Sequence, residues 1–428
     1  PEKIEKAACL DICFFDFSAD CYRKVQLAEK EREMKLTEET PFFFIYSVWT
    51  KNGEYREQVK RLVTDYDNYI SLKLAGDDAY LSEKMVGYPA ELDEVYAESF
   101  EEQKKEWFSC VGDGIQECRN TWEHKKWNIT DLPEFELAIT IDRPELYYDF
   151  LQKDWTRFCH DYWKNNFLEH HTLSKKRVTR IYIGNQFCHN LFPRKELLFQ
   201  VLEKALENNL AVTLAFSYIR NHLLEEIDEL LQELEVWCQS REKEAGKDQE
   251  EIIVNDWAMP ILLQGKPHLK PVLGVLLNKR RKDVRLPYKH GIGNHVDSLA
   301  ENNLNCGFYQ DYLKNTFDIQ RFEFESCGYK VTIPDGHHSL HLPFFQTNTS
   351  QYCTLYAVCR YGDRGKQKLP ENCPRYCNKK VFLYPKHLKM VGRYNSLFGY
   401  DEKILWDEKQ LQDYLEQGIE RIVVNVSL

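Results

Sequence analysis

The sequence has 428 residues, and its 43% of hydrophobic residues suffice for one large barrel or two to three ordinary domains. The formal net charge of −11 argues against broad nucleic-acid binding, which depends on Lys and Arg, although residues 278–283 (NKRRKD) form a local basic run. No secretory signal and no membrane span is expected, because residues 1–6 are charged and Asp11 and Asp16 interrupt the following apolar run. We therefore expect a cytoplasmic protein.

Residues 1–134 are expected to form an additional, mainly helical N-terminal region of unknown role. They contain charged helical stretches at 55–69 and 91–107, many aromatic residues and no alternating strand and helix units. Cys9, Cys13 and Cys21 are open to two interpretations, a second metal site or buried thiols that pack as small apolar side chains. Burial is favoured for them and also for Cys110 and Cys118.

From residue 135 onward, short apolar runs alternate with amphipathic segments. Strands are predicted at 136–141, 178–184, 210–216, 251–255, 272–276, 320–324, 330–333 and 342–347. Helices are predicted at 193–208, 221–237 and 410–419, and a final strand at 421–426. Eight strands favour an α/β fold with a (β/α) barrel-like core in a domain spanning 135–428. The gap between residues 324 and 330 is too short for a crossover helix, so the barrel can be irregular.

Fourteen cysteines are many for a cytoplasmic protein, in which disulfides seldom persist, so metal binding explains at least some of them. Cys373 and Cys377 lie four positions apart in a stretch rich in Pro, Asn and charge, where two thiolates can converge on one metal. Cys188 and Cys353 each follow a predicted strand. If both strands belong to one parallel barrel, these cysteines meet at the face where strand carboxyl ends open. Four thiolates suffice for an iron–sulfur cluster or for zinc.

The order of several segments resembles the collagenase-like peptidase family, and most of all the iron–sulfur subunits of oxygen-independent ubiquinone hydroxylation. The segments are YIGNQFC at 182–188, VNDW at 254–257, HLPFFQTNTSQYC at 341–353, CPRYC at 373–377 and VFLY at 381–384. The resemblance covers roughly residues 135–426 and lies in motif order more than in continuous identity. The (β/α) barrel is also the fold that it implies.

The resemblance implies a 4Fe-4S cluster held by four cysteines, Cys188, Cys353, Cys373 and Cys377. Zinc in the same positions is the alternative. The spacing from Cys353 to Cys373 is longer than in the ubiquinone subunits, which leaves Cys359 as a rival ligand. The implied activity is an oxygen-independent, hydroxylation-type modification of a small aromatic compound or an RNA base, with a second family member as a heterodimer partner.

Five residues are candidates for substrate binding: Asn185, Asn255, Asp256, Arg321 and Glu323. Asn255 and Asp256 stand at a predicted strand end, where they can meet substrate, but Asp256 can equally cap the next helix. Arg321, Glu323 and Glu325 alternate along one strand and so share a face, for which the barrel interior is favoured. His337, His338 and His341 follow the turn at 334–336, which favours a solvated turn over a zinc site.

No Gly-rich phosphate loop, G-x-S-x-G elbow, H-E-x-x-H motif or local cysteine-protease signature is present. Nucleotide chemistry and classical hydrolysis are therefore disfavoured, and the sequence assigns no catalytic residue. Two other functions stay open, a binding or assembly subunit with a structural cluster, and a peptidase.

Overall fold

The computed structural model describes residues 9–14, 34–39, 44–49, 108–110, 119, 121–128, 132–245, 250–284, 300–363, 365–366, 368–370, 372–383 and 389–426. The chain divides into two compact units, Pro1–Ile70 and Ser71–Leu428. In the first unit, β1 (Cys9–Phe14), β2 (Met34–Glu39) and β3 (Phe44–Trp49) form an antiparallel sheet of order β1-β3-β2. The helices expected at 55–69 and 91–107, Cys21 and Cys118 lie outside the described residues, as do the side chains of Cys9, Cys13 and Cys110.

The second unit contains eight parallel strands in the order β10-β11-β16-β5-β6-β7-β8-β9. Their bounds are β5 (Glu136–Ile141), β6 (Arg180–Gly184), β7 (Ala211–Ala215), β8 (Glu250–Val254), β9 (Leu269–Leu273), β10 (Glu323–Glu325), β11 (His338–Leu342) and β16 (Ile419–Val424). A bridge from Leu273 to Phe322 joins the two edge strands, and the Leu273 N–H donates to the Arg321 carbonyl over 3.0 Å. The sheet is thus nearly closed, which confirms the predicted barrel-like core.

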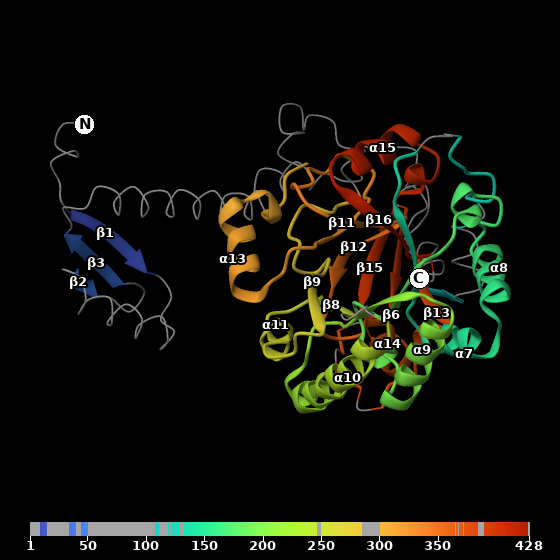
Figure 1. Ribbon diagram of the computed structural model, residues 1–428, viewed down its shortest axis with the longest axis horizontal. Coiled ribbons are helices and arrows are strands. Elements are labelled where there is room, and N and C mark those ends of the chain that lie inside the picture. Colours follow the sequence, from blue (N-terminus) through green and yellow to red (C-terminus); the bar gives the residue numbers. More distant parts are fainter. Residues whose placement is uncertain are drawn as a thin grey trace. The chain divides into compact units, whose positions relative to one another are not determined.

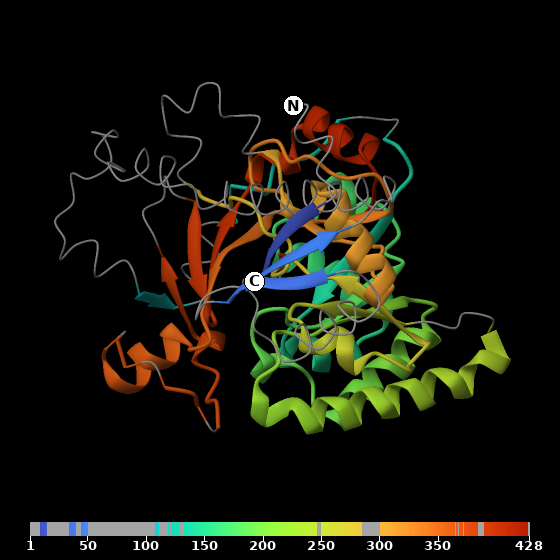
Figure 2. The same ribbon diagram turned by 90° about the vertical axis from the view of Figure 1, so that its left-hand side faces the viewer.

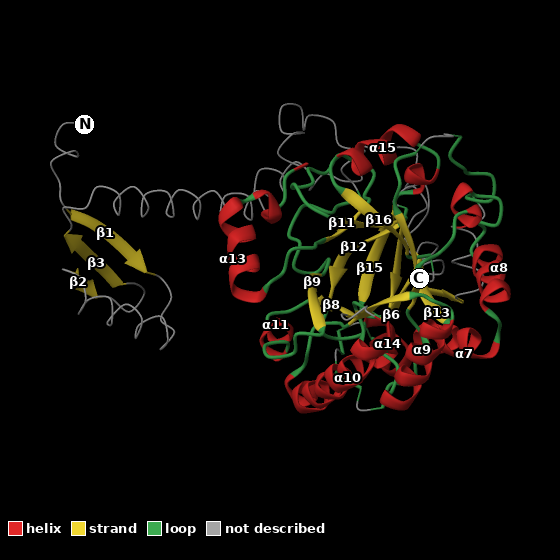
Figure 3. Cartoon of the chain, viewed as in Figure 1, coloured by secondary structure: helices red, strands yellow, loops and turns green. Residues whose placement is uncertain are grey.

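Helices surround this sheet (Figure 1 and Figure 3). They are α7 (Pro144–Gln152), α8 (Trp155–Asn165), α9 (Lys195–Glu207), α10 (Leu224–Ala245), α11 (Ala258–Leu262) and α13 (Gly307–Phe317). Figure 2 shows α10 as one long yellow-green helix on the outside of the barrel. The apolar residues at helical spacing form the buried face of α9, since Leu198, Val201, Leu202 and Ala205 are inaccessible to solvent. Among the helices of the described residues, none has the length and apolar content to cross a membrane.

A second, antiparallel sheet has the order β12-β15-β14-β13-β4, and its strands β12 to β15 lie between β11 and β16 in the chain. It comprises β4 (Phe108–Cys110), β12 (Phe344–Thr349), β13 (Lys380–Leu383), β14 (Met390–Arg393) and β15 (Ser396–Tyr400). Two helices accompany it, α14 (Thr354–Tyr361) after β12 and α15 (Glu408–Glu416) before β16. Because β4 pairs with β13, part of the first 134 residues belongs to this sheet.

Three predictions for residues 330–347 are wrong, two about strands and one about a turn. Residues 330–333 are irregular, and the predicted strand 342–347 is divided between β11 and β12, which belong to different sheets. Pro343 lies at the break and has no N–H to donate to a sheet. His338 and His341 are buried in β11, at 0% and 2% exposure, so they do not form a solvated turn.

Candidate functional site

Four cysteines from three separate parts of the chain line one cavity: Cys188, Cys353, Cys373 and Cys377. Asn190, Leu191 and three tyrosines, Tyr356, Tyr376 and Tyr394, complete its wall. The cavity measures about 20 Å³, or about 350 Å³ with the adjoining open solvent. The four cysteines proposed from the sequence are therefore close neighbours, and we call this space the cysteine cavity.

Local hydrogen bonds hold the first two cysteines in place. Cys188 lies in the loop after β6, where the Asn185 side-chain oxygen accepts from the N–H groups of Phe187 and Cys188, both over 2.9 Å. Cys353 is the N-cap of α14, and its sulfur accepts from the Tyr356 N–H over 3.4 Å. The same thiol donates to the Tyr394 carbonyl over 3.0 Å. These contacts fix the backbone of Cys188 and the sulfur of Cys353.

Cys373 and Cys377 come from the irregular stretch that precedes β13, and Cys377 lies in a 3₁₀ turn, Tyr376–Asn378. The Nε of Arg393, on β14, donates to the Cys377 carbonyl over 3.3 Å. Cys359 lies on α14 and is not among the residues that line the cavity. The geometry thus groups Cys353, rather than Cys359, with the other three.

Burial, together with a smaller effect of the neighbouring cysteines, raises the pKa values of Cys188, Cys353 and Cys377 to about 12. The Arg393 guanidinium acts in the opposite direction on the pKa of Cys377. With no cation in the cavity these sulfurs are protonated thiols at neutral pH, whereas a metal binds thiolates and releases their protons. Thiolates in the cysteine cavity therefore need a bound cation to offset their charge.

Among the described residues, no group of three or more His, Cys, Asp or Glu side chains is arranged around a single ion position. The four cysteines surround a cavity. Their donor set is four sulfurs, which suits an iron–sulfur cluster and also suits zinc.

A second cavity lies where the carboxyl ends of the barrel strands open, and we call it the barrel mouth. Its wall contains Thr140, Asp142, Tyr182, Gly184, Asn185, Gln186, Phe187, Ala215, Val275, Glu325, His341 and Asn425. Small residues on β5, β6 and β7 leave a cavity of about 30 Å³, or about 440 Å³ with the open solvent at its mouth, where barrels usually pack bulky side chains. Phe187 lines the barrel mouth and the next residue, Cys188, lines the cysteine cavity, so the two cavities are adjacent.

Comparisons with protein-family models, curated proteins and solved structures found no match. The function must therefore be argued from these two cavities and from the motif order of the sequence.

Of the residues predicted to bind substrate, Asn185 lies in the barrel mouth, whereas Asn255 and Asp256 bond to the backbone of nearby loops and helices. Asn255 is buried and its side chain donates to the Phe216 carbonyl over 2.8 Å. Asp256 caps α11, because its Oδ1 accepts from the N–H groups of Ala258 and Met259, both over 3.0 Å. These contacts are those of a helix cap, the second of the two interpretations of Asp256.

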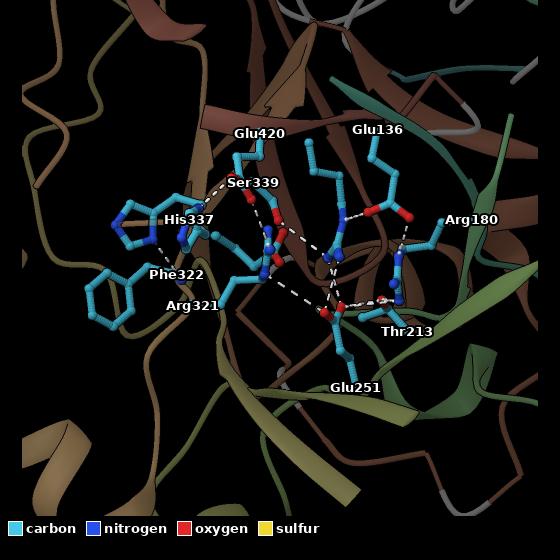
Figure 4. A network of polar contacts seen from close by, with 12 residues as sticks. Glu136, Arg180, Thr213, Glu251, Arg321, Phe322, His337, Ser339 and Glu420 are labelled. Atoms are coloured by element: carbon cyan, nitrogen blue, oxygen red, sulfur yellow. Dashed lines mark hydrogen bonds and ion pairs between the residues drawn. The ribbon is translucent and has the colours of Figure 1, made fainter. Parts of the chain in front are cut away.

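Arg321 lies at the opposite end of the barrel, in a network of charged side chains at the amino ends of the strands (Figure 4). It contacts Glu251 at 3.7 Å and Glu420 at 3.5 Å. Glu323 points into the barrel interior, where it is fully buried and its Oε2 lies 2.5 Å from the His341 Nε2. Of the five candidates, Asn185 reaches the barrel mouth directly, and Glu323 reaches it through His341.

Sequence reasoning missed Asp142 and His341 as residues of the barrel mouth. Asp142 immediately follows the strand predicted at 136–141, so the rule that favours strand ends could have found it. His341 gave no such signal, because its strand was predicted as a turn.

Proposed function

We propose that this chain binds a 4Fe-4S cluster through Cys188, Cys353, Cys373 and Cys377 and supports an oxygen-independent redox modification of a small aromatic compound or a nucleic-acid base. The observation that carries the proposal is the cysteine cavity. Cysteines at positions as distant as 188 and 377 line it together. Chance packing of four among fourteen cysteines would not select the four that the motif order implies.

The surroundings of the cysteine cavity fit such a cluster. Arg393 adds a positive charge next to Cys377, which offsets part of the negative charge of four thiolates. Tyr356, Tyr376 and Tyr394 cover the cavity with aromatic rings and so limit its contact with water. Four cysteine ligands fill the cluster's coordination, so when bound it supplies single electrons rather than a binding position for substrate.

The adjacent barrel mouth supports a redox role over a purely structural one. Phe187 packs edge-on against Phe398, with ring centroids 4.8 Å apart, and Phe398 packs against Tyr394 at 6.3 Å. Phe187 belongs to the wall of the barrel mouth and Tyr394 to the wall of the cysteine cavity. A compound bound in the barrel mouth is thus separated from the cysteines by a short stretch of packed side chains.

Metal and sulfide analysis of protein purified without air tests the proposal. We expect about four irons and four sulfides per chain and a broad visible absorbance that reduction bleaches. Cys377→Ser should remove most of the iron, whereas Cys359→Ser, a cysteine of the same region outside the cavity, should retain it. About one zinc per chain, without iron, would show that the four cysteines form a zinc site instead of a cluster site. Protein with neither metal, or equal iron loss in both variants, would refute the proposal.

A further inference from the structure

The barrel mouth contains a buried carboxylate, one oxygen of which lacks a hydrogen-bond donor in the part of the chain that the structure describes. Asp142 is 9% exposed, and its Oδ1 has no hydrogen-bond partner among the described residues. The other carboxylate of the cavity, Glu325, is matched by the buried Lys282 at 2.6 Å and by the Gln346 N–H at 2.7 Å. Burying a carboxylate without a donor is costly, so such a group marks a place where a ligand supplies the donor.

The second acceptor of the cavity is the Nδ1 of His341, and a chain of hydrogen bonds in the barrel interior determines its protonation. The Nη1 of Arg421 donates to the Tyr182 hydroxyl over 3.1 Å, and that hydroxyl donates to the Glu323 Oε1 over 3.1 Å. The other oxygen of Glu323 lies 2.5 Å from the Nε2 of His341. A carboxylate that accepts from Nε2–H fixes the histidine tautomer, and the lone pair then lies on Nδ1.

His341 lines the barrel mouth, and among the described residues its Nδ1 has no hydrogen-bond partner. The cavity therefore holds two acceptors with no donor of their own, the Asp142 carboxylate and the His341 Nδ1. They come from β11 and from the end of β5, which are separated in the sheet by β16 alone. Phe187 and Tyr182 add aromatic walls, which favour a flat ligand.

We propose that the barrel mouth binds a small planar ring compound that presents at least two hydrogen-bond donors, one to Asp142 and one to the Nδ1 of His341. Glu323 is a positioning residue that holds the histidine in its acceptor tautomer. A ring whose polar groups are carboxylates is rejected, because it would meet Asp142 with like charge. The inference depends on the proposed function only in treating this ligand as the substrate of the redox reaction.

Binding of benzamidine to the full chain tests the inference, because this compound is a flat ring with paired N–H donors. We expect benzamidine to bind the wild-type protein in calorimetry and benzoate, the matching ring with acceptors only, not to bind. Asp142→Asn should weaken benzamidine binding by about tenfold or more, as loss of a charge-assisted contact does. Asp311→Asn, an exposed aspartate on α13, should leave it unchanged. Absent benzamidine binding, equal benzoate binding, or equal effects of the two variants would overturn the inference.

A measurement without ligand tests the histidine directly and does not depend on the folding of Asp142→Asn. In protein with ¹⁵N-labelled histidine, the His341 Nδ1 resonance is assigned as the one that His341→Gln lacks. It should have the chemical shift of an unprotonated nitrogen. Glu323→Leu should change that resonance, since the partner that fixes the tautomer is gone. A protonated Nδ1 in the wild type would overturn the assignment. Both experiments are run on protein with and without bound iron, so failure of the cluster proposal and failure of this one give separate results.

Discussion

Arg421 is a guanidinium with 2% exposure in the barrel interior, and it is stable there because acceptors surround it. It contacts both oxygens of Glu251, at 2.7 and 3.0 Å, and the Glu136 carboxylate at 2.6 Å. Arg180 adds contacts to both of these glutamates, at 3.3 and 2.8 Å (Figure 4). Removal of one member of such a network leaves buried charges unpaired, which costs more than the pair itself contributes.

The first prediction concerns the pH dependence that Glu251 contributes. Burial alone would raise its pKa, but Arg180 and Arg421 outweigh burial and lower it from 4.5 to about 2. This stabilisation is present above the unfolded pKa of 4.5 and is lost as pH falls toward 2. At about 1.4 kcal/mol per pKa unit, Glu251→Gln should reduce the free energy of unfolding at pH 7 by about 3 kcal/mol. Urea unfolding at pH 7, 4.5 and 3 measures both effects, and the variant's loss should shrink as pH falls.

Glu420→Gln is the matched control, because Glu420 also contacts Arg321 but its side chain is 48% exposed. Exposed pairs contribute little, so its unfolding free energy should stay within about 0.5 kcal/mol of the wild type. Equal losses for the two variants would contradict the argument that burial makes the network strong.

At the scale of single elements, periodicity predicted the early strands and the helices α9, α10 and α15, but it missed α7, α8, α11, α13 and α14 and predicted polar or proline-containing strands poorly. The strand predicted at 136–141 coincides with β5, and 251–255 differs from β8 by one residue. The strand β11 was missed because His338 and His341 look like turn residues until Glu323 and the ring of Phe322 are seen packed against them. Such contacts between the neighbouring strands β10 and β11 depend on the folded sheet, which a local pattern does not contain.

A second prediction separates the two interpretations of Asp256 at the start of α11. Asp256→Ala removes the acceptor for three backbone N–H groups, those of Ala258, Met259 and Ile219, so the unfolding free energy should fall by about 1 to 2 kcal/mol. Asp256→Asn keeps the oxygen that accepts from α11 but faces the Ile219 N–H with an amide nitrogen, so it should recover part of this loss. Denaturant midpoints measure both. A substrate-binding role would instead leave stability unchanged and weaken benzamidine binding.

At the scale of the whole molecule, the sequence identified the four cysteines that line the cysteine cavity but not the barrel mouth beside it. Cysteines are rare enough that their spacing and motif order carry information. Asp142, His341 and Tyr182 are separated by up to 199 positions and have no shared spacing, so only the closed sheet brings them together. The insertion of the second sheet also explains how Cys353 joins Cys188 although β12 is not a barrel strand.

The last prediction concerns β16, the last strand of the barrel in the chain. It pairs with β11 on one side and with β5, the first strand of the barrel, on the other. Its residues Ile422, Val423 and Val424 are fully buried, and Arg421 precedes them. A chain that ends at Gly418 loses both ladders and leaves Glu251 and Glu136 without Arg421, so it should not fold cooperatively. Near-ultraviolet circular dichroism and thermal melting measure this loss. A chain of residues 71–428 is the control, since β1, β2 and β3 pair only with one another among the described strands. That shorter chain should melt cooperatively and keep its iron, whereas cooperative melting of residues 1–418 would show that the barrel does not need β16.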